Sequence, residues 1–257
     1  MQINSNIESN LAKAMNKVSV QKHSRSYELC IRADAMRFAK LYRESVKCYL
    51  DSIMLDRNHQ EAYWGLASSY KYLKEYTKAI KMLEKLIELD DKNDKYFFEL
   101  GVCHLCDGQP ELAIPHLVHS IVLNKENLEA QIQLAIAHEL VDEADLSLMI
   151  YNKLIETNPE FLKAYYNKAA MLMGMGDFEE ASKTFFKLIK RNPDYYKAYL
   201  GIGMSFDKLE RYSDAIRYYK KFLKLKHFSE DALFARQRIK ELKEHLPKKN
   251  NNLGLVH

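Results

Sequence analysis

The chain has 257 residues, of which 47% are hydrophobic and 29% charged, a composition that excludes a disordered protein along most of its length. It contains no run of eighteen apolar residues, so no helix is expected to cross a membrane. Eight glycines and five prolines favour helices over a β-protein rich in tight turns, and a net charge of +4 is too small to indicate nucleic-acid binding by itself.

The four cysteines and the first residues of the chain bear on its cellular location. Four cysteines are too few for the disulfide framework of a secreted domain. Residues 1–20 lack the apolar core that follows a basic head in a secretory signal. We therefore expect a cytoplasmic protein with free thiols.

The segment 1–25 is expected to hold a short helix or to be disordered. Apolar residues at helical spacing indicate the helix; they are Ile7, Leu11, Met15 and Val18. The alternatives are a frayed terminus, an N-terminal cap, or a helix that occupies a groove of its own or a neighbouring chain.

From residue 26 onward the sequence repeats itself every 34 positions. One recurring position is small: Ala33, Ala67, Gly101, Ala135, Ala169 and Gly203. A second is also small: Ser45, Ala79, Ala113, Ser147, Ala181 and Ala215. A third is large: Tyr49, Leu83, Leu117, Tyr151, Phe185 and Tyr219. The sequence thus predicts six repeats, 26–59, 60–93, 94–127, 128–161, 162–195 and 196–229.

Physical reasons connect these positions to a stack of helix pairs. A small residue where two helices cross lets their backbones approach to about 8 Å, and a large residue fills the space beside the crossing. No single repeat can bury its apolar face alone, so each must stack on its neighbour. Pro159 and Pro193 are expected to stop a helix and to fix the turn that follows.

The pattern resembles the tetratricopeptide repeat, a helix–turn–helix unit of 34 residues. The first helix of that unit begins with an aromatic residue, matched by Tyr63, Phe97, Tyr165 and Tyr199. The resemblance implies an all-α fold, a right-handed α–α superhelix (solenoid) of six hairpins. Arg32 and Lys168 depart from it, because both replace a leucine. An amphipathic stretch over 230–247 predicts a C-terminal capping helix, and 248–257 a flexible tail.

The resemblance also implies a binding surface, because first helices in this family line a concave groove. From the second repeat to the sixth, the fifth and ninth repeat positions are mainly apolar or aromatic. They are Trp64, Ser68, Phe98, Val102, Ile132, Ile136, Tyr166, Ala170, Leu200 and Met204. We expect these residues to bind another protein, as a peptide or an amphipathic helix.

Motifs of phosphate binding, serine hydrolysis, zinc proteolysis and calcium binding are missing from the sequence. We therefore expect a non-catalytic scaffold, adaptor or chaperone-like protein that needs no cofactor. A CxxC pair at Cys103 and Cys106 precedes His116 and His119, but the gaps differ from those of zinc fingers, so no metal site is predicted.

Charge is distributed unevenly along the repeats. Residues 128–161 carry one basic and seven acidic side chains, whereas residues 196–229 carry eight basic and three acidic ones. Such asymmetry could orient a partner or favour head-to-tail self-association into an assembly scaffold. A basic patch is predicted at Arg217, Lys220, Lys221 and Lys224. It leaves an RNA-associated role as an alternative, although nucleic acid is not the expected partner.

Overall fold

The structure is a computed structural model that describes residues 20, 21 and 23–246. The helix predicted around Ile7–Val18 and the tail over 248–257 lie outside the described residues. Every regular element among the described residues is a helix. None of these helices is long and apolar enough to cross a membrane.

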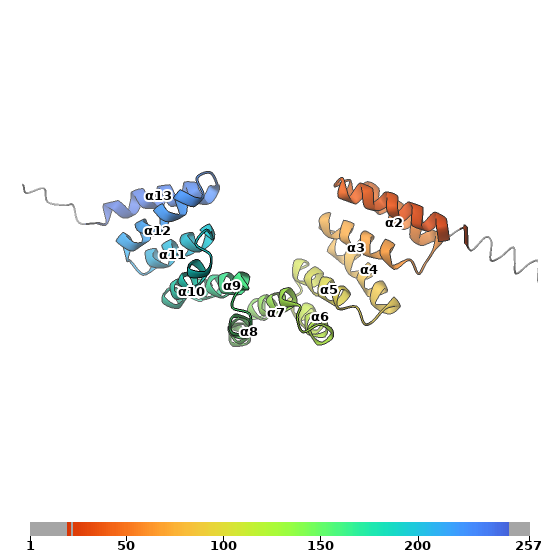
Figure 1. The fold of residues 1–257 in the computed structure, drawn as a ribbon, viewed down its shortest axis with the longest axis horizontal. Coiled ribbons are helices and arrows are strands. Elements are labelled where there is room, and N and C mark those ends of the chain that lie inside the picture. The colour runs from red at the N-terminus through yellow and green to blue at the C-terminus, as the bar shows by residue number, and fades with distance from the viewer. Residues whose placement is uncertain (1–19, 22, 247–257) are drawn as a thin grey trace, which may run out of the picture. The chain divides into compact units, whose positions relative to one another are not determined.

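The chain forms two compact units that divide after Ala144 (Figure 1). Unit 1 contains a helix over 23–38, α2 (Tyr42–Leu55), α3 (Gln60–Tyr72), α4 (Tyr76–Leu89), α5 (Asp94–Cys106), α6 (Pro110–Leu123) and α7 (Leu128–Leu140). Unit 2 contains α8 (Ala144–Thr157), which begins at the boundary, α9 (Leu162–Gly174), α10 (Phe178–Arg191), α11 (Tyr196–Lys208), α12 (Tyr212–Leu225) and α13 (Glu230–Glu244). Successive helices pair as antiparallel hairpins within each unit, α3 with α4 and α11 with α12 for example.

The helices recur with the period of the sequence. The first helices α3, α5, α7, α9 and α11 begin at Gln60, Asp94, Leu128, Leu162 and Tyr196, each 34 residues after the last. The helices α8 and α10 end at Thr157 and Arg191, two residues before Pro159 and Pro193. Both prolines therefore lie in the turns, as their missing N–H group and fixed φ angle predict.

The close crossing expected between small and large residues is present in both units. In unit 1, a Cβ atom placed on Gly101 would lie 2.6 Å from Cγ of Leu117. In unit 2, a Cβ atom on Gly203 would lie 2.7 Å from Cδ1 of Tyr219. Leu117 and Tyr219 are fully buried, so each large side chain fills the space that the missing side chain leaves.

A turn that the sequence patterns did not reveal joins the two helices of a hairpin. The fifteenth residue of each 34-residue step has a positive φ, between 57° and 83°: Lys40, Lys74, Gly108, Asp142, Gly176 and Glu210. The next residue donates its backbone N–H to a carbonyl five residues earlier, as from Leu41 to Met36 at 2.9 Å. This is the Schellman ending of a helix, which usually places glycine at the left-handed position. Glycine stands at only two of the six positions, Gly108 and Gly176, so that sequence signal is present at two turns and missing from four.

A buried polar cluster fixes the helix over 23–38 to the next hairpin. The hydroxyl oxygen of Ser26 lies 2.7 Å from Nδ1 of His59 and 2.9 Å from the hydroxyl of Ser52. The hydroxyl of Ser52 in turn lies 3.0 Å from the same Nδ1. All three residues are buried, so each hydrogen bond replaces one that water would otherwise make.

The C-terminal helix α13 covers the end of unit 2. Its buried side chains pack into the hydrophobic core of unit 2, which also contains Phe222; they are Ala232, Ala235, Ile239 and Leu242. The guanidinium group of Arg238 donates two hydrogen bonds to the carboxylate of Asp207 in α11, at 2.6 and 2.9 Å. Paired donors in a fixed plane hold this helix in one register.

We expect Gly203→Ala to destabilise the protein by about 1–2 kcal/mol, because the added methyl group overlaps the ring of Tyr219. Gly174→Ala is the matched control in the same unit, since no atom lies within 4 Å of its added Cβ. That control is expected to leave stability unchanged or to raise it by up to about 1 kcal/mol. Urea unfolding followed by circular dichroism measures both, and equal effects would contradict the close crossing.

The buried imidazole of His59 is expected to make stability depend on pH. Burial lowers the pKa of His59 from its ordinary 6.5, although the carboxylates of Glu61 and Asp56 act in the opposite direction. The folded protein therefore favours the neutral ring, and stability falls as the pH drops below 6.5 toward the lower folded pKa. We expect the wild type to lose more unfolding free energy than His59→Gln between about pH 7.5 and pH 5. Equal losses would show that His59 contributes nothing to the pH dependence.

Candidate functional site

The first helices of unit 1 present a partly exposed surface of large side chains. We call it the unit 1 surface and define it by Trp64, Ser68, Phe98, Val102 and Ile136, all of which are partly exposed. The indole of Trp64 lies against the ring of Tyr96, with 5.5 Å between ring centroids. Neighbouring aromatic rings hold the indole in place while one side of it stays in contact with water.

A small hollow opens beside Trp64 between α3 and α5. Its lining combines apolar side chains with one ion pair; the lining residues are Trp64, Ala67, Ser68, Lys71, Leu83, Glu99 and Cys103. The ammonium group of Lys71 donates to the carboxylate of Glu99 across 2.5 Å. Burial alone would lower the pKa of Lys71, but the hydrogen bond and charge of Glu99 outweigh it and raise that pKa. The hollow has room for about one water molecule, so an apolar side chain would cover its rim beside this fixed pair of charges.

The ion pair was not found from the sequence. Lys71 is the twelfth residue of its 34-residue step and Glu99 the sixth of the next, so the two lie 28 positions apart. Opposite charges at these two positions of neighbouring repeats are the signal that could have revealed the pair.

Ile132 does not belong to the surface where the sequence placed it. Its side chain is only 2% exposed, whereas Ile136 one turn later is partly exposed. A partner can contact only what water can reach, so Ile132 is removed from the predicted binding residues. The fifth repeat position is thus a core position in α7 and a surface position in α3 and α5.

The corresponding residues of unit 2 form a second, separate surface. Tyr166 and Leu200 are partly exposed, as is Met204, while Ala170 is exposed. The ring of Tyr166 packs between Phe185 and Tyr195, at centroid distances of 6.0 and 5.7 Å. We call Tyr166, Ala170, Leu200 and Met204 the unit 2 surface. It contains one aromatic residue, Tyr166, where the unit 1 surface contains two, Trp64 and Phe98.

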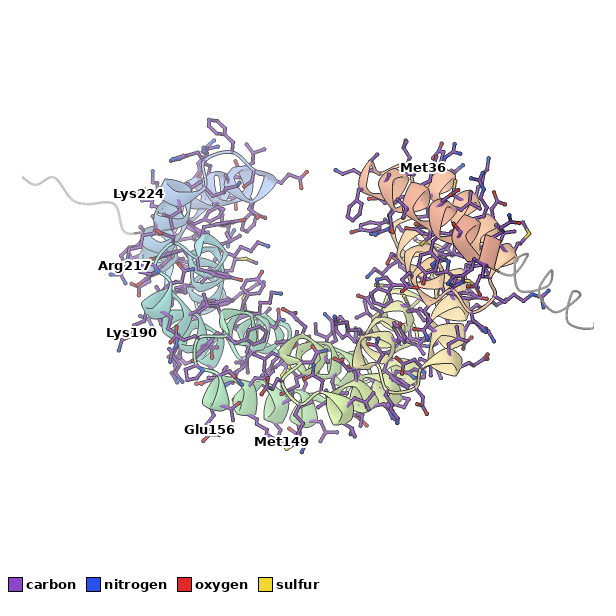
Figure 2. The ribbon with its side chains drawn as sticks, turned by 45° about the vertical axis from the view of Figure 1, so that its right-hand side comes forward. Met36, Met149, Glu156, Lys190, Arg217 and Lys224 are labelled. Carbon is purple, nitrogen blue, oxygen red and sulfur yellow. The ribbon has the colours of Figure 1, made fainter. Side chains whose placement is uncertain are left out.

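The basic residues expected at the C-terminal end lie together on α12. Arg217, Lys220, Lys221 and Lys224 are all exposed and line one shallow hollow with Ser213 and Ile216. Figure 2 shows Arg217 and Lys224 extending away from the helices of unit 2, with Lys190 of α10 beside them. The patch is partly neutralised, because Asp214 lies 2.6 Å from the guanidinium group of Arg217.

The CxxC motif has its two thiols in different environments. Cys103 is 1% exposed, and burial raises the pKa of its thiol to about 12, while Cys106 is exposed. The ring of His116 stacks on His104 at 5.4 Å, and His119 packs on Phe97 at 4.1 Å. Across the described part of the chain, no three His, Cys, Asp or Glu side chains are placed to hold a metal ion.

Comparison with known sequences identifies the repeats. The family described as "Tetratricopeptide repeat" matches residues 60–93 and residues 166–230. No curated protein sequence matches the chain.

Solved structures agree with this family. A crystal structure of MamA is 25% identical over 64% of this chain and 96% of that one, with a TM-score of 0.58. PilW, described as a type IV pilus biogenesis factor, is 17% identical over 82% and 98% of the two chains, with a TM-score of 0.68. A tetratricopeptide repeat protein from Parabacteroides merdae is 16% identical over 94% and 95%, with a TM-score of 0.64. At these identities the last two show a shared fold only. The sequence matches identify tetratricopeptide repeats over residues 60–93 and 166–230 of this chain.

Proposed function

We propose that the protein is a non-catalytic scaffold whose unit 1 surface binds a peptide carrying large apolar side chains. Tetratricopeptide repeat proteins are typically interaction modules without catalytic activity, so we expect this chain to bind a partner and to catalyse no reaction. The observation that carries the proposal is the partly exposed indole of Trp64 beside the hollow that Lys71 and Glu99 border. A cytoplasmic location fits four cysteines that are all free thiols.

The residues around the hollow define the peptide. When an apolar side chain of the peptide covers the indole of Trp64, both the side chain and the indole lose contact with water. This loss is the main source of affinity in such contacts. The pair of Lys71 and Glu99 is already satisfied internally, so a peptide gains little by presenting a single charge to it. A backbone amide or a hydroxyl group can still accept from the ammonium or donate to the carboxylate. The best ligand is therefore an extended or helical segment with two or more large apolar residues and little net charge.

Trp64 provides the measurement, because it is the only tryptophan in the chain. Peptides selected from a random library on phage against the purified protein are expected to be rich in Leu, Phe and Trp. Binding of a selected peptide without tryptophan should shift the fluorescence emission of Trp64, since the indole loses contact with water. The affinity should change little with salt, because the contact is mainly apolar.

Val102→Glu is expected to weaken binding of that peptide at least about tenfold, because it places a carboxylate on the apolar surface. Leu50→Glu is the control, as Leu50 is 41% exposed on α2, away from the unit 1 surface. Circular dichroism should show both variants equally helical. Equal weakening by both variants, or binding that leaves the emission of Trp64 unchanged, would refute the proposal for this surface.

A second candidate function rests on the basic face of unit 2. Cationic residues at three positions of α10 recur 34 residues later in α12. The pairs are Lys183 with Arg217, Lys187 with Lys221, and Lys190 with Lys224, and all six side chains are exposed. Two parallel rows of positive charge suit a partner with regularly spaced negative charges, such as the phosphates of RNA.

This candidate predicts binding that weakens steeply with salt. Fluorescence anisotropy with a labelled single-stranded RNA should show an affinity that falls by a factor of ten or more between roughly 50 and 200 mM salt. Reversal of Lys220, Lys221 and Lys224 to Glu should abolish it, whereas Val102→Glu should not affect it. Binding that is absent at low salt, or that survives the reversal, excludes an RNA role for this face.

A further inference from the structure

The unit 1 surface crosses three consecutive first helices. Trp64 lies on α3, Phe98 and Val102 lie on α5, and Ile136 lies on α7. The ring contact between Trp64 and Tyr96 joins α3 to α5, and α5 contacts α7 directly. The axes of packed helices are about 8–10 Å apart, so a ligand that crosses these helices meets a large apolar side chain at each such interval.

Hydrogen-bond donors lie beside the apolar side chains of this surface. The hollow next to Trp64 is lined by Ser68 and by Lys71, whose ammonium group keeps N–H donors beyond the one that Glu99 accepts. Within the described part of the chain, neither the indole N–H of Trp64 nor the hydroxyl of Ser68 makes a hydrogen bond. These donors lose their water when a ligand covers them, so the ligand must bring acceptors.

An α-helix and a polyproline II segment differ in the acceptors that they offer. The helix uses its backbone carbonyls internally, so a helix laid across this surface would cover the donors without pairing them. A polyproline II segment has no internal hydrogen bonds, and its carbonyl oxygens are free to accept. The negative ends of these carbonyl dipoles are complementary in charge to the indole N–H, the hydroxyl and the ammonium group.

The spacing of the helices distinguishes polyproline II from a β-strand, which also offers free carbonyls. In a β-strand, the side chains of one face recur about every 7 Å. In polyproline II, every third side chain lies on the same face, about 9 Å from the one before. The second spacing agrees with the distance between packed helices, and the first does not.

We propose that the ligand of the unit 1 surface is a polyproline II segment with a large apolar residue at every third position. This inference rests on the proposed function of the surface and adds the conformation and the residue spacing of its ligand. Successive apolar side chains contact Trp64 on α3, Val102 on α5 and Ile136 on α7. Ser68 and Lys71 determine specificity, because they donate hydrogen bonds to carbonyl oxygens between these contacts.

The balance of donors and acceptors favours proline between the apolar residues of the ligand. The acceptors beside Trp64 are the carboxylate of Glu99 and the hydroxyl oxygen of Ser68, whereas Trp64, Ser68 and Lys71 all donate. A proline residue brings a carbonyl but no N–H group, so it adds no donor that would need a partner. Its fixed φ angle also holds the free peptide near the polyproline II conformation, which lowers the entropy lost on binding.

Designed peptides without tryptophan, about twelve residues long, test the spacing. The first repeats Leu-Pro-Ser, so that leucine occupies every third position. The second has the same composition with its leucines at every second position, and the third is an alanine-rich helix with leucines on one face. Titration followed by the fluorescence of Trp64 is expected to show that the first binds at least about tenfold tighter than the others. Circular dichroism verifies the conformation of each free peptide.

Ser68→Ala tests the contact with the ligand backbone. It should weaken binding of the Leu-Pro-Ser peptide about fivefold, because one carbonyl oxygen loses its donor while the apolar surface remains. It should weaken binding of the helical peptide less than about twofold, since the helix offers no free carbonyl there. Ser24→Ala is the matched control and should change neither affinity, because Ser24 is an exposed serine of unit 1 outside the unit 1 surface.

The outcomes separate this proposal from the proposed function. Equal affinities of the first two peptides, or tighter binding of the helical one, would overturn the polyproline II ligand and leave apolar peptide binding in place. An equal loss for the first and third peptides on Ser68→Ala would also overturn it, because Ser68 would then not act through the ligand backbone. If neither the designed peptides nor any peptide selected from a random library binds, the proposed function is refuted and the polyproline II ligand with it.

Discussion

The contact on which the structure depends is a small residue of one helix against a large residue of its neighbour. Gly101 against Leu117 in unit 1 and Gly203 against Tyr219 in unit 2 leave no room for a single added carbon. This contact sets how closely two helices approach, and through that the stacking of one hairpin on the next. Because it recurs at a fixed interval, the core residues of each repeat take equivalent positions, whereas the exposure of the remaining positions varies.

The repeated core leaves function to the positions that the core does not need. Within unit 1, the first helices expose Trp64 and Phe98 on one surface, while α6 exposes Val118 and Val122 on its outer face. Within unit 2, the outer face of α12 is cationic instead. One fold thus offers surfaces of different chemistry, and substitutions on them can change a partner without changing the stack.

The surfaces differ in how they would recognise a partner. In unit 1, the aromatic side chain of Trp64 lies beside the hydrogen-bonded pair of Lys71 and Glu99. This arrangement suits a mostly apolar ligand whose backbone can form hydrogen bonds. The cationic outer face of α12 instead suits a partner with negative charges, whose binding weakens with salt.

The sequence by itself determined the helical class, the 34-residue period and the pairing of Gly203 with Tyr219, because these follow from the size and spacing of residues along one chain. Tertiary structure alone decided which of the equivalent positions remain in contact with water. Ile132 is buried although Trp64 and Phe98, at the same repeat position, are partly exposed. It also decided that Lys74 takes a left-handed backbone where Gly108 does so without strain, and that Lys71 meets Glu99. Exposure and cross-repeat contacts depend on the packing of neighbouring helices, and a pattern read along one helix does not contain that information.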